Sequence, residues 1–322
     1  MAVYTKVDLV EAQNFIDKNY ELEDILSIVE ISEGVENTNY ILETRSNKYI
    51  LTLYEDRVSV SDLPFFIDLM VYLDERNIVC PKPIRMKNGK YIEVLNGRYA
   101  AIFSFLSGKS ARKITNRNCF LVGQTLANLH EQTSEIKIMR QNQLSQKHLS
   151  KLFDSIENET FTIRKSLQSE IRDELNYLNS NWPAELPNGI IHGDLFPDNI
   201  FFNGDELSGV IDFYFACNDF YVFDIGISIN AWCFEKDNSF NITKAKHLLQ
   251  GYNSIKALTY QEIDSLPIMC RGSALRFLLT RLIDWNKPGD NALVIPKDPI
   301  EYYAKLKFHQ TVISAKDYGL YD

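Results

Sequence analysis

The chain has 322 residues, which is enough for one large domain or for two lobes that each bury a core. Its hydrophobic content of 45% and charged content of 24% are ordinary for a soluble globular protein. The formal net charge of −9 argues against a nucleic-acid-binding protein, because such proteins normally carry a basic face.

The first hundred residues are predicted to form mainly β-strands. Five short segments are rich in Ile, Tyr and Val and are separated by turn residues. They are Ile25–Ser32, Thr38–Thr44, Lys48–Glu55, Lys90–Leu95 and Arg98–Leu106. The turns Asn88-Gly89 and Asn96-Gly97 are strong hairpin signals, so we expect antiparallel neighbours. The segment Leu63–Asn77 has helical periodicity and is expected to pack as one helix on the sheet.

Beyond Gly108 the pattern becomes helical, with apolar residues at i, i+3 and i+4 in three segments. These segments are Asn118–Thr133, Ser166–Trp182 and Met269–Asn286. Two short β-like runs, Asn199–Phe202 and Ser208–Phe213, interrupt the helices. The order of elements predicts an α+β chain with two lobes: a small antiparallel-β N-lobe over residues 1–105 and a larger, mainly helical C-lobe over 106–322.

The stretch "GIIHGDLFPDNIFFNGDELSGVIDFYFACND" (Gly189–Asp219) carries polar groups between apolar runs. Asp194 precedes Asn199 by five positions, the D-x-x-x-x-N interval of a protein-kinase catalytic loop, and Asp212 lies on the next apolar run. Phosphoryl transfer needs an oriented acceptor hydroxyl and metal-bound phosphates, and Mg²⁺ prefers carboxylate and amide oxygens. The stretch is therefore either a phosphoryl-transfer centre or a pair of strands joined by acidic turns, since Asp and Asn also favour turns.

The string "HGDLFPDN" followed by "GVIDF" resembles the catalytic signature of the aminoglycoside-phosphotransferase and choline-kinase-like superfamily. These are small-molecule kinases with a protein-kinase-like fold. Further segments are similar to the same family: "ENTNYIL" to its nucleotide loop, "IFSFLSGK" to its interlobe hinge, "GQTLANLHEQT" to its first C-lobe helix and "DIGISINAW" to the segment after the metal aspartate. The resemblance covers nearly the whole chain and implies a bilobal protein-kinase-like fold that uses ATP and Mg²⁺.

The resemblance implies a role for five residues of this region. Asp194 resembles the catalytic aspartate that orients the acceptor hydroxyl and accepts its proton. Asn199 and Asp212 resemble the two magnesium ligands. His192 and Asp224 resemble structural residues that support the catalytic loop.

The implied nucleotide contacts form a second group, in which the phosphate-binding pattern is incomplete. They are Gly34, Asn37, Thr38 and Asn39 in the nucleotide loop, Thr52 on the third strand, and Ser104, Phe105 and Leu106 at the hinge. Thr52 stands where kinases carry a phosphate-binding lysine, and the facing helix offers Phe66 or Asp68 in place of the partner glutamate. The chain is therefore either an active kinase that supports the phosphates differently or an inactive nucleotide-binding pseudokinase.

Within the superfamily the chain most resembles the homoserine kinases, in "YILTLYEDRV", "DLPFFIDLMVYL", "HGDLFPDNIFF" and "ALRFLLTRLIDW". This resemblance implies transfer of the ATP γ-phosphoryl group to the hydroxyl of L-homoserine, which gives O-phospho-L-homoserine on the route to threonine. The alternatives within the class are kinases that act on choline or ethanolamine, methylthioribose or an aminoglycoside.

An acceptor with a carboxylate and an ammonium group would suit arginine, acidic and aromatic side chains. The candidates for its contacts are Asp198, Tyr214, Trp232, Arg276 and Arg281. Each of them has an alternative role in packing or in structural ion pairs.

The five cysteines form no CxxC pair and are odd in number, which favours a reducing compartment over a disulfide framework. The first residues lack the apolar core of a secretory signal, and no stretch reaches the length of a membrane helix. We therefore expect a cytoplasmic protein that binds a small-molecule substrate and neither nucleic acid nor membrane. The sequence leaves open whether it is a monomer or a homodimer.

Overall fold

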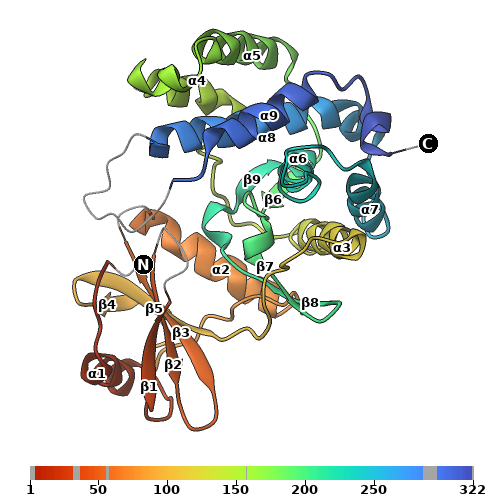
Figure 1. Ribbon diagram of the computed structural model, residues 1–322. Helices are drawn as coiled ribbons and strands as arrows, with labels where there is room; N and C mark the ends of the chain where they lie inside the picture. Colours follow the sequence, from red (N-terminus) through yellow and green to blue (C-terminus); the bar gives the residue numbers. More distant parts are fainter. Residues whose placement is uncertain (1–3, 32–36, 56–57, 157, 286–295, 321–322) are drawn as a thin grey trace. The chain divides into compact units, whose positions relative to one another are not determined.

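The computed structural model of the chain describes residues 4–31, 37–55, 58–156, 158–285 and 296–320 (Figure 1). Within them the chain forms two compact units. The first holds the described residues up to Gly108 together with Ser208–Tyr214, and the second holds those of 109–207, 215–288 and 296–322. The first is built on an antiparallel sheet and the second is mainly helical, so the predicted α+β class is confirmed.

The sheet of the first unit has the order β1-β2-β3-β5-β4 within the described residues, and every neighbouring pair is antiparallel. Its strands are β1 (Ser27–Ile31), β2 (Thr38–Glu43), β3 (Lys48–Tyr54), β4 (Glu93–Leu95) and β5 (Arg98–Ser104). The five predicted strands are confirmed, but β4 is shorter than predicted. Lys90 is held in a turn instead, because its carbonyl accepts from the Met86 N–H at 2.8 Å and its own N–H donates to Asn88 Oδ1 at 2.9 Å.

Two helices complete the first unit, α1 (Leu9–Asn19) and α2 (Leu63–Asp74). The predicted helix corresponds to α2, which buries Leu63, Phe66 and Leu69 among others. The expectation of mainly strands missed α1, although its capping box is visible in the sequence. Asp8 accepts from the Glu11 N–H at 2.8 Å while Glu11 accepts from the Asp8 N–H at 2.9 Å, which satisfies two unpaired donors of the first turn.

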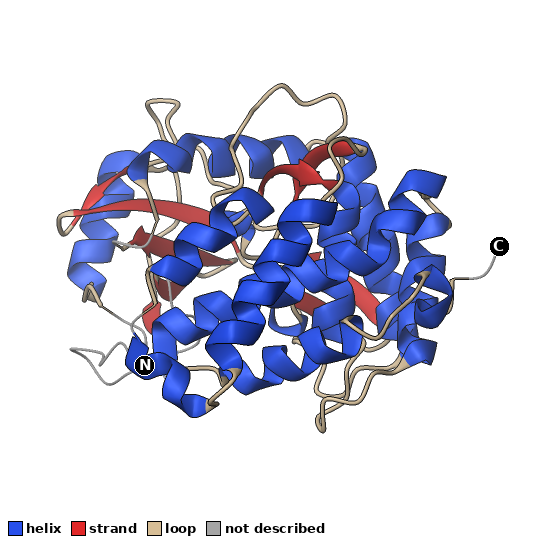
Figure 2. Cartoon of the chain, turned by 90° about the horizontal axis from the view of Figure 1, so that it is seen from above, coloured by secondary structure: helices blue, strands red, loops and turns tan. Residues whose placement is uncertain are grey.

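Seven helices form most of the second unit as described, and Figure 2 shows how much of the chain is helical. They are α3 (Asn116–Gln132), α4 (Gln146–Asp154), α5 (Leu167–Asn181), α6 (Tyr221–Trp232), α7 (Ile242–Asn253), α8 (Tyr260–Trp285) and α9 (Pro299–His309). Helix α8 packs against α6 and α9, and α3 packs against α7. The three predicted helices correspond to α3, α5 and the C-terminal part of α8. Helix α6 was missed because it is apolar on nearly every side, so no stripe marks it.

Short strands and turns connect these helices around the predicted catalytic stretch. Strand β6 (Asn188–Ile191) pairs with β9 (Cys217–Phe220) in antiparallel register. The first predicted β-like run corresponds to β7 (Ile200–Asn203). The second corresponds to β8 (Glu206–Val210) only in part, because the chain leaves the strand after Val210 and Asp212 has a φ of +65°. Five short 3₁₀ segments lie among the described residues: η1 (Val60–Asp62), η2 (Asn158–Ile163), η3 (Pro197–Asn199), η4 (Phe213–Phe215) and η5 (Ala315–Tyr318).

All five cysteines are free and buried. Burial raises the pKa of Cys80, Cys217 and Cys270 to about 12 and that of Cys233 well above its ordinary value. These thiols are therefore poor nucleophiles in the folded protein, because the thiolate is the reactive form.

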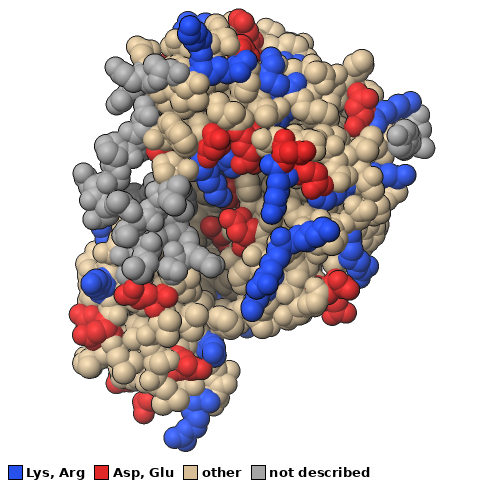
Figure 3. Space-filling view, in the orientation of Figure 1, with Lys and Arg blue, Asp and Glu red and all other residues tan. Residues whose placement is uncertain are grey.

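The visible surface in Figure 3 carries Lys and Arg side chains interspersed with Asp and Glu side chains. Mixed charge of this kind, with a net charge of −9, offers no extended basic face to a polyanion on the side shown. Among the described helices, none is long and apolar enough to cross a membrane.

Candidate active site

The predicted catalytic loop of the second unit begins where β6 ends. Strand β6 is held by β9, with Ile191 opposite Cys217, and the chain then turns through His192, Gly193 and Asp194. The loop continues into η3, which ends at Asn199. The loop is thus anchored at its start by a strand pair and at its end by a short helical turn.

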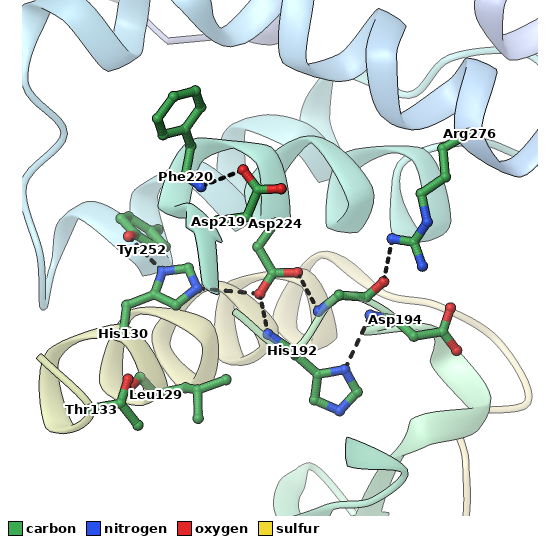
Figure 4. A network of polar contacts seen from close by, with 11 residues as sticks. Leu129, His130, Thr133, His192, Asp194, Asp219, Phe220, Asp224, Tyr252 and Arg276 are labelled. Atoms are coloured by element: carbon green, nitrogen blue, oxygen red, sulfur yellow. Dashed lines mark hydrogen bonds and ion pairs between the residues drawn. The ribbon is translucent and has the colours of Figure 1, made fainter. Parts of the chain in front are cut away.

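A buried carboxylate from α6 holds the backbone of this loop (Figure 4). Asp224 is fully buried and accepts from the His192 N–H at 2.7 Å and from the Gly193 N–H at 3.0 Å. Its Oδ2 atom also lies 3.2 Å from His130 Nε2. These contacts suit the structural role that the sequence assigns to Asp224.

Asp224 remains ionised because donors compensate for its burial. Burial alone would raise its pKa, but the hydrogen bond from His130, the electrostatic effect of the His130 and His192 imidazoles, and the His192 N–H hold the pKa below the ordinary value. Burial in turn lowers the pKa of His130 against the opposing effect of Asp224. A neutral His130 then donates from Nε2 to Asp224, while its Nδ1 accepts from the Tyr252 hydroxyl at 2.9 Å.

Gly193 occupies a conformation and a space that only glycine fits. Its φ is +76°, and a Cβ atom there would lie 2.7 Å from the Phe215 carbonyl oxygen. We expect Gly193→Ala to lower the free energy of unfolding by more than the ~1–2 kcal/mol of a left-handed alanine, and to reduce kcat because the loop must shift. Urea unfolding and steady-state kinetics would measure the two effects.

Gly97 offers a matched control for that substitution. Its φ is +79°, nearly the same, but a Cβ atom there would meet nothing within 4 Å. Gly97→Ala should therefore show only the backbone strain. Equal losses of stability in the two variants would contradict the proposed clash with Phe215.

Asp194 and Asn199 contact each other inside the loop. Asn199 Nδ2 donates to the Asp194 carbonyl at 2.8 Å and lies 3.2 Å from Asp194 Oδ2. The Asp194 N–H donates to Nδ1 of the buried His192 at 3.2 Å, which is the supporting contact expected of this histidine. Since Asn199 uses Nδ2 for both bonds, its amide oxygen is the atom that can bind a cation.

The environment of Asp194 makes it a stronger base than a surface aspartate. Burial raises the pKa of Asp194 to about 6; the Arg276 charge, Lys297 and the Asn199 hydrogen bond oppose this shift, and Asp198 adds to it. A carboxylate with this pKa is still ionised at neutral pH but accepts a proton more readily.

Arg276 lies on the opposite side of the loop from Asp224. Its side chain is 2% exposed, and its Nη1 atom donates to the Gly193 carbonyl at 2.6 Å. Its guanidinium carbon lies 4.6 Å from the ring centroid of Phe277 and 5.5 Å from that of Phe215. The predicted contact of Arg276 with an acceptor carboxylate gains no support from these partners.

The other acceptor candidates of the second unit have similar structural partners. Trp232 is fully buried and its Nε1 donates to the Leu195 carbonyl at 2.7 Å. Arg281 binds Glu301 Oε2 at 2.7 Å and the Asp298 carbonyl at 2.8 Å. The contact of Trp232 and Arg281 with an acceptor stays a prediction, because these partners give it no support. Asp198 is exposed, and its side chain lies 3.7 Å from Lys297 Nζ.

The predicted metal ligand Asp212 belongs to the first unit. It follows β8 with a φ of +65°, a left-handed conformation that aspartate tolerates better than most residues and that often marks functional positions. The Val210 N–H donates to the Val79 carbonyl at 3.0 Å, and the Ser208 hydroxyl donates to the Ser107 carbonyl at 2.8 Å. The segment that carries Asp212 is thus fixed to the hinge region.

Tyr214 follows two positions later and packs inside the first unit. Its ring meets Tyr54 and Phe66 edge-on, with centroids 5.6 Å and 5.5 Å apart. Phe66 is one of the two residues predicted to stand in place of the usual glutamate, so an aromatic cluster lies beside that predicted position. The predicted contact of Tyr214 with an acceptor gains no support from this packing.

The predicted lysine position is occupied by a threonine that bonds across the sheet. The hydroxyl of Thr52 donates to Asn39 Oδ1 at 2.7 Å, from the strand position directly opposite. Thr38 is fully buried, accepts from the Tyr4 N–H and donates to Glu55, so its hydroxyl is already engaged. Asn39 is more accessible than Thr38.

Two further nucleotide predictions concern the loop start and the hinge. Asn37 is buried and accepts from the Glu55 N–H at 3.4 Å, and Gly34 lies outside the described residues. At the hinge, Ser104 exchanges hydrogen bonds with Lys82 through its N–H and its hydroxyl. Hydrogen bonds to an adenine would therefore come from the backbone of Phe105 and Leu106, which stays a prediction.

Several residues that shape the loop could not be found from the sequence. His130 and Tyr252 lie 94 and 28 positions from Asp224, on helices whose patterns show only core positions, and no short motif links them. For Trp232 and Arg276 the sequence predicted contact with the acceptor. Neither residue type nor spacing predicts their hydrogen bonds to the backbone carbonyls of Leu195 and Gly193.

Comparison with known proteins defines the class to which this fold and loop belong. The chain matches the phosphotransferase enzyme family over residues 27–258 and therefore belongs to that family. It is similar to the homoserine kinase of Rhizobium meliloti (strain 1021), with 48% identity over 320 residues that cover 99% of this chain and 98% of the relative. A homoserine kinase of Agrobacterium fabrum is also 48% identical, over 99% of each chain.

Solved structures of small-molecule kinases share the fold. A spectinomycin phosphotransferase is similar with a TM-score of 0.68 and 15% identity, covering 98% of each chain. A choline kinase from Cryptosporidium parvum is similar with a TM-score of 0.66 and 15% identity, covering 96% of each chain. The predicted membership of this superfamily and its kinase-like fold are confirmed.

Proposed function

We propose that this protein is a homoserine kinase, which transfers the γ-phosphoryl group of ATP to the side-chain hydroxyl of L-homoserine. The observation that carries the proposal is the 48% identity to homoserine kinases along 99% of the chain. The matched region extends over 99% of the chain and therefore spans both compact units.

In the proposed reaction Asp194 orients the hydroxyl of homoserine and accepts its proton. The hydroxyl oxygen forms a bond to the γ-phosphorus while the bond to the bridging oxygen of ADP breaks, giving O-phospho-L-homoserine and ADP. The raised pKa of Asp194, at about 6, suits a group that must take a proton near neutral pH. Asp224 and His192 keep the loop in the geometry that this step needs.

The two side chains proposed as magnesium ligands are chemically suited to that ion. Asn199 offers an amide oxygen and Asp212 a carboxylate, both of which are hard oxygen donors that Mg²⁺ prefers. The left-handed backbone of Asp212 and the use of Nδ2 alone in the hydrogen bonds of Asn199 support this assignment. Bound Mg²⁺ would neutralise phosphate charge. Among the structural neighbours, the amicoumacin kinase hAmiN was solved with AMP-PNP and Ca²⁺.

We also propose that the protein acts in the cytoplasm on its free small-molecule substrate. Five free, buried cysteines suit a reducing compartment, where thiols are not oxidised to disulfides.

An assay of ADP release with a panel of hydroxyl compounds tests the proposed function. The panel contains homoserine, serine, threonine, choline and kanamycin, each with MgATP. We expect turnover that prefers homoserine and that disappears in Asp194→Ala. A preference for choline or kanamycin would refute the substrate, and no turnover with retained MgATP binding would favour a pseudokinase, which the threonine at position 52 motivates.

A further inference from the structure

The backbone of Gly193, between His192 and Asp194, is held by two buried charged side chains from two different helices. Asp224 on α6 accepts from the Gly193 N–H at 3.0 Å, and Arg276 on α8 donates to the Gly193 carbonyl at 2.6 Å (Figure 4). Both side chains are almost completely excluded from solvent. The residue that directly precedes the catalytic aspartate is therefore fixed on both its N–H and its C=O side.

The arginine that makes the second of these bonds is itself firmly oriented. Its guanidinium packs near two aromatic rings. One belongs to Phe215, the last residue of η4, and the other to Phe277, the next residue of α8. Arginine suits such a position because its planar cation can stack on aromatic faces while donating hydrogen bonds. A charged donor also makes a shorter and stronger bond to a carbonyl than a neutral donor.

The Gly193 carbonyl matters for catalysis because it belongs to the peptide plane that carries the Asp194 nitrogen. A rotation of this plane would move the start of the Asp194 side chain. With φ at +76°, Gly193 has access to backbone conformations that other residues avoid, so the loop needs an external restraint at this position. The bond to Arg276 supplies that restraint from outside the loop.

We propose that Arg276 is a positioning residue for phosphoryl transfer, which holds Asp194 in its reactive orientation through the Gly193 carbonyl and does not bind the acceptor. This inference rests on the proposed kinase function for its kinetic test. It replaces the contact with an acceptor carboxylate that the sequence suggested for this arginine. It also explains why the loop needs a cation on α8 as well as the carboxylate on α6.

The test compares Arg276→Met and Arg276→Lys with Arg271→Met as control. Arg271 lies on the same helix and also packs its guanidinium on an aromatic ring. Among the residues that the structure describes, its hydrogen bonds of 2.7 Å and 2.6 Å go to Glu174 and not to the loop. We expect Arg276→Met to lower kcat by about 100-fold, the effect of a misplaced catalytic group. Arg276→Lys should lower kcat less than Arg276→Met does, since the lysine side chain keeps a hydrogen-bond donor and a positive charge.

Two measurements separate positioning from acceptor binding. Calorimetry on the AMP-PNP complex should show a homoserine Kd within about threefold of wild type for Arg276→Met, whereas loss of a carboxylate ligand would raise it by tenfold or more. Hydrogen exchange of the peptide spanning residues 192–199 should be faster in Arg276→Met than in Arg271→Met. This second readout needs no activity, so it stands even if the wild type fails to phosphorylate homoserine and the proposed function is wrong.

The proposal is overturned by either of two results. One is a large rise in the Kd for homoserine in Arg276→Met, which would place the arginine on the acceptor. The other is exchange of the loop amides in Arg276→Lys and Arg276→Met that equals that of Arg271→Met. If Arg276→Met does not fold, the same comparison is made with Arg276→Lys.

Discussion

Replacing Asp194 with asparagine is expected to lower kcat by about 10²–10⁴-fold, the usual contribution of a general base, and at the same time to make the folded protein more stable at pH 8. Because burial raises the pKa of Asp194 to about 6, the folded state holds a proton on this group more tightly than the unfolded state does. Ionised Asp194 therefore destabilises the fold at pH 8, by at most about 3 kcal/mol, and this effect vanishes below about pH 4. Asparagine carries no charge and can still accept from Asn199.

Urea unfolding at pH 8 and pH 4, in buffer with a chelator and without nucleotide, would measure the change in stability. The variant should gain free energy of unfolding at pH 8 and little at pH 4. Asp205→Asn is the matched control, because Asp205 lies in an exposed turn in the same stretch. A variant that loses activity without gaining stability at pH 8 would show that Asp194 is not a base of raised pKa.

Lowering the pH from 7 toward 4 is expected to destabilise the protein through His309. This histidine is fully buried, with Nδ1 2.8 Å from the Tyr318 hydroxyl and Nε2 3.1 Å from Asn230 Oδ1. Burial, together with the charges of Lys305 and Arg271, lowers its pKa to about 3. In the unfolded chain His309 therefore takes up a proton near pH 6.5, whereas in the folded protein it stays neutral until the pH approaches 3. Its contribution is complete above pH 6.5 and falls by about 1.4 kcal/mol per pH unit until pH 3.

His309→Gln isolates this contribution from those of other titrating groups. The variant should be less stable at pH 7, by about 1–3 kcal/mol, because glutamine fits the two hydrogen bonds less well. Its stability should nevertheless depend less steeply on pH between 6.5 and 4 than that of the wild type. Parallel pH profiles for the two proteins, measured by urea unfolding, would exclude His309 as the source of acid sensitivity.

The fold was predictable where a local pattern determined it. The five strands of the first unit follow from β-branched and aromatic runs separated by turn residues, and α2 follows from its periodicity. Helix α6 could not be predicted, because a helix buried on all sides has no polar face to reveal its period. Helix α1 was predictable in principle, because the spacing of Asp8 and Glu11 matches a capping box.

The candidate site divides in the same way. The spacing of Asp194, Asn199 and Asp212 is contained in one stretch of sequence, so residue types and intervals predicted these positions. The surroundings of the loop come from residues far apart in the chain, and only the tertiary structure brings His130 and Arg276 to it. An arginine that binds a backbone carbonyl and one that binds a substrate carboxylate look the same in a sequence. This is why the predicted role of Arg276 differs from the contact that is found.

Because every native thiol is buried, the folded protein should react little with thiol reagents before a cysteine is introduced for labelling. A single cysteine introduced on the surface would react with a maleimide dye far faster than the five natural ones. Two such cysteines, one in each compact unit, would carry a fluorophore pair without any need to remove native residues. Energy transfer between the dyes could then be compared with and without MgATP and homoserine.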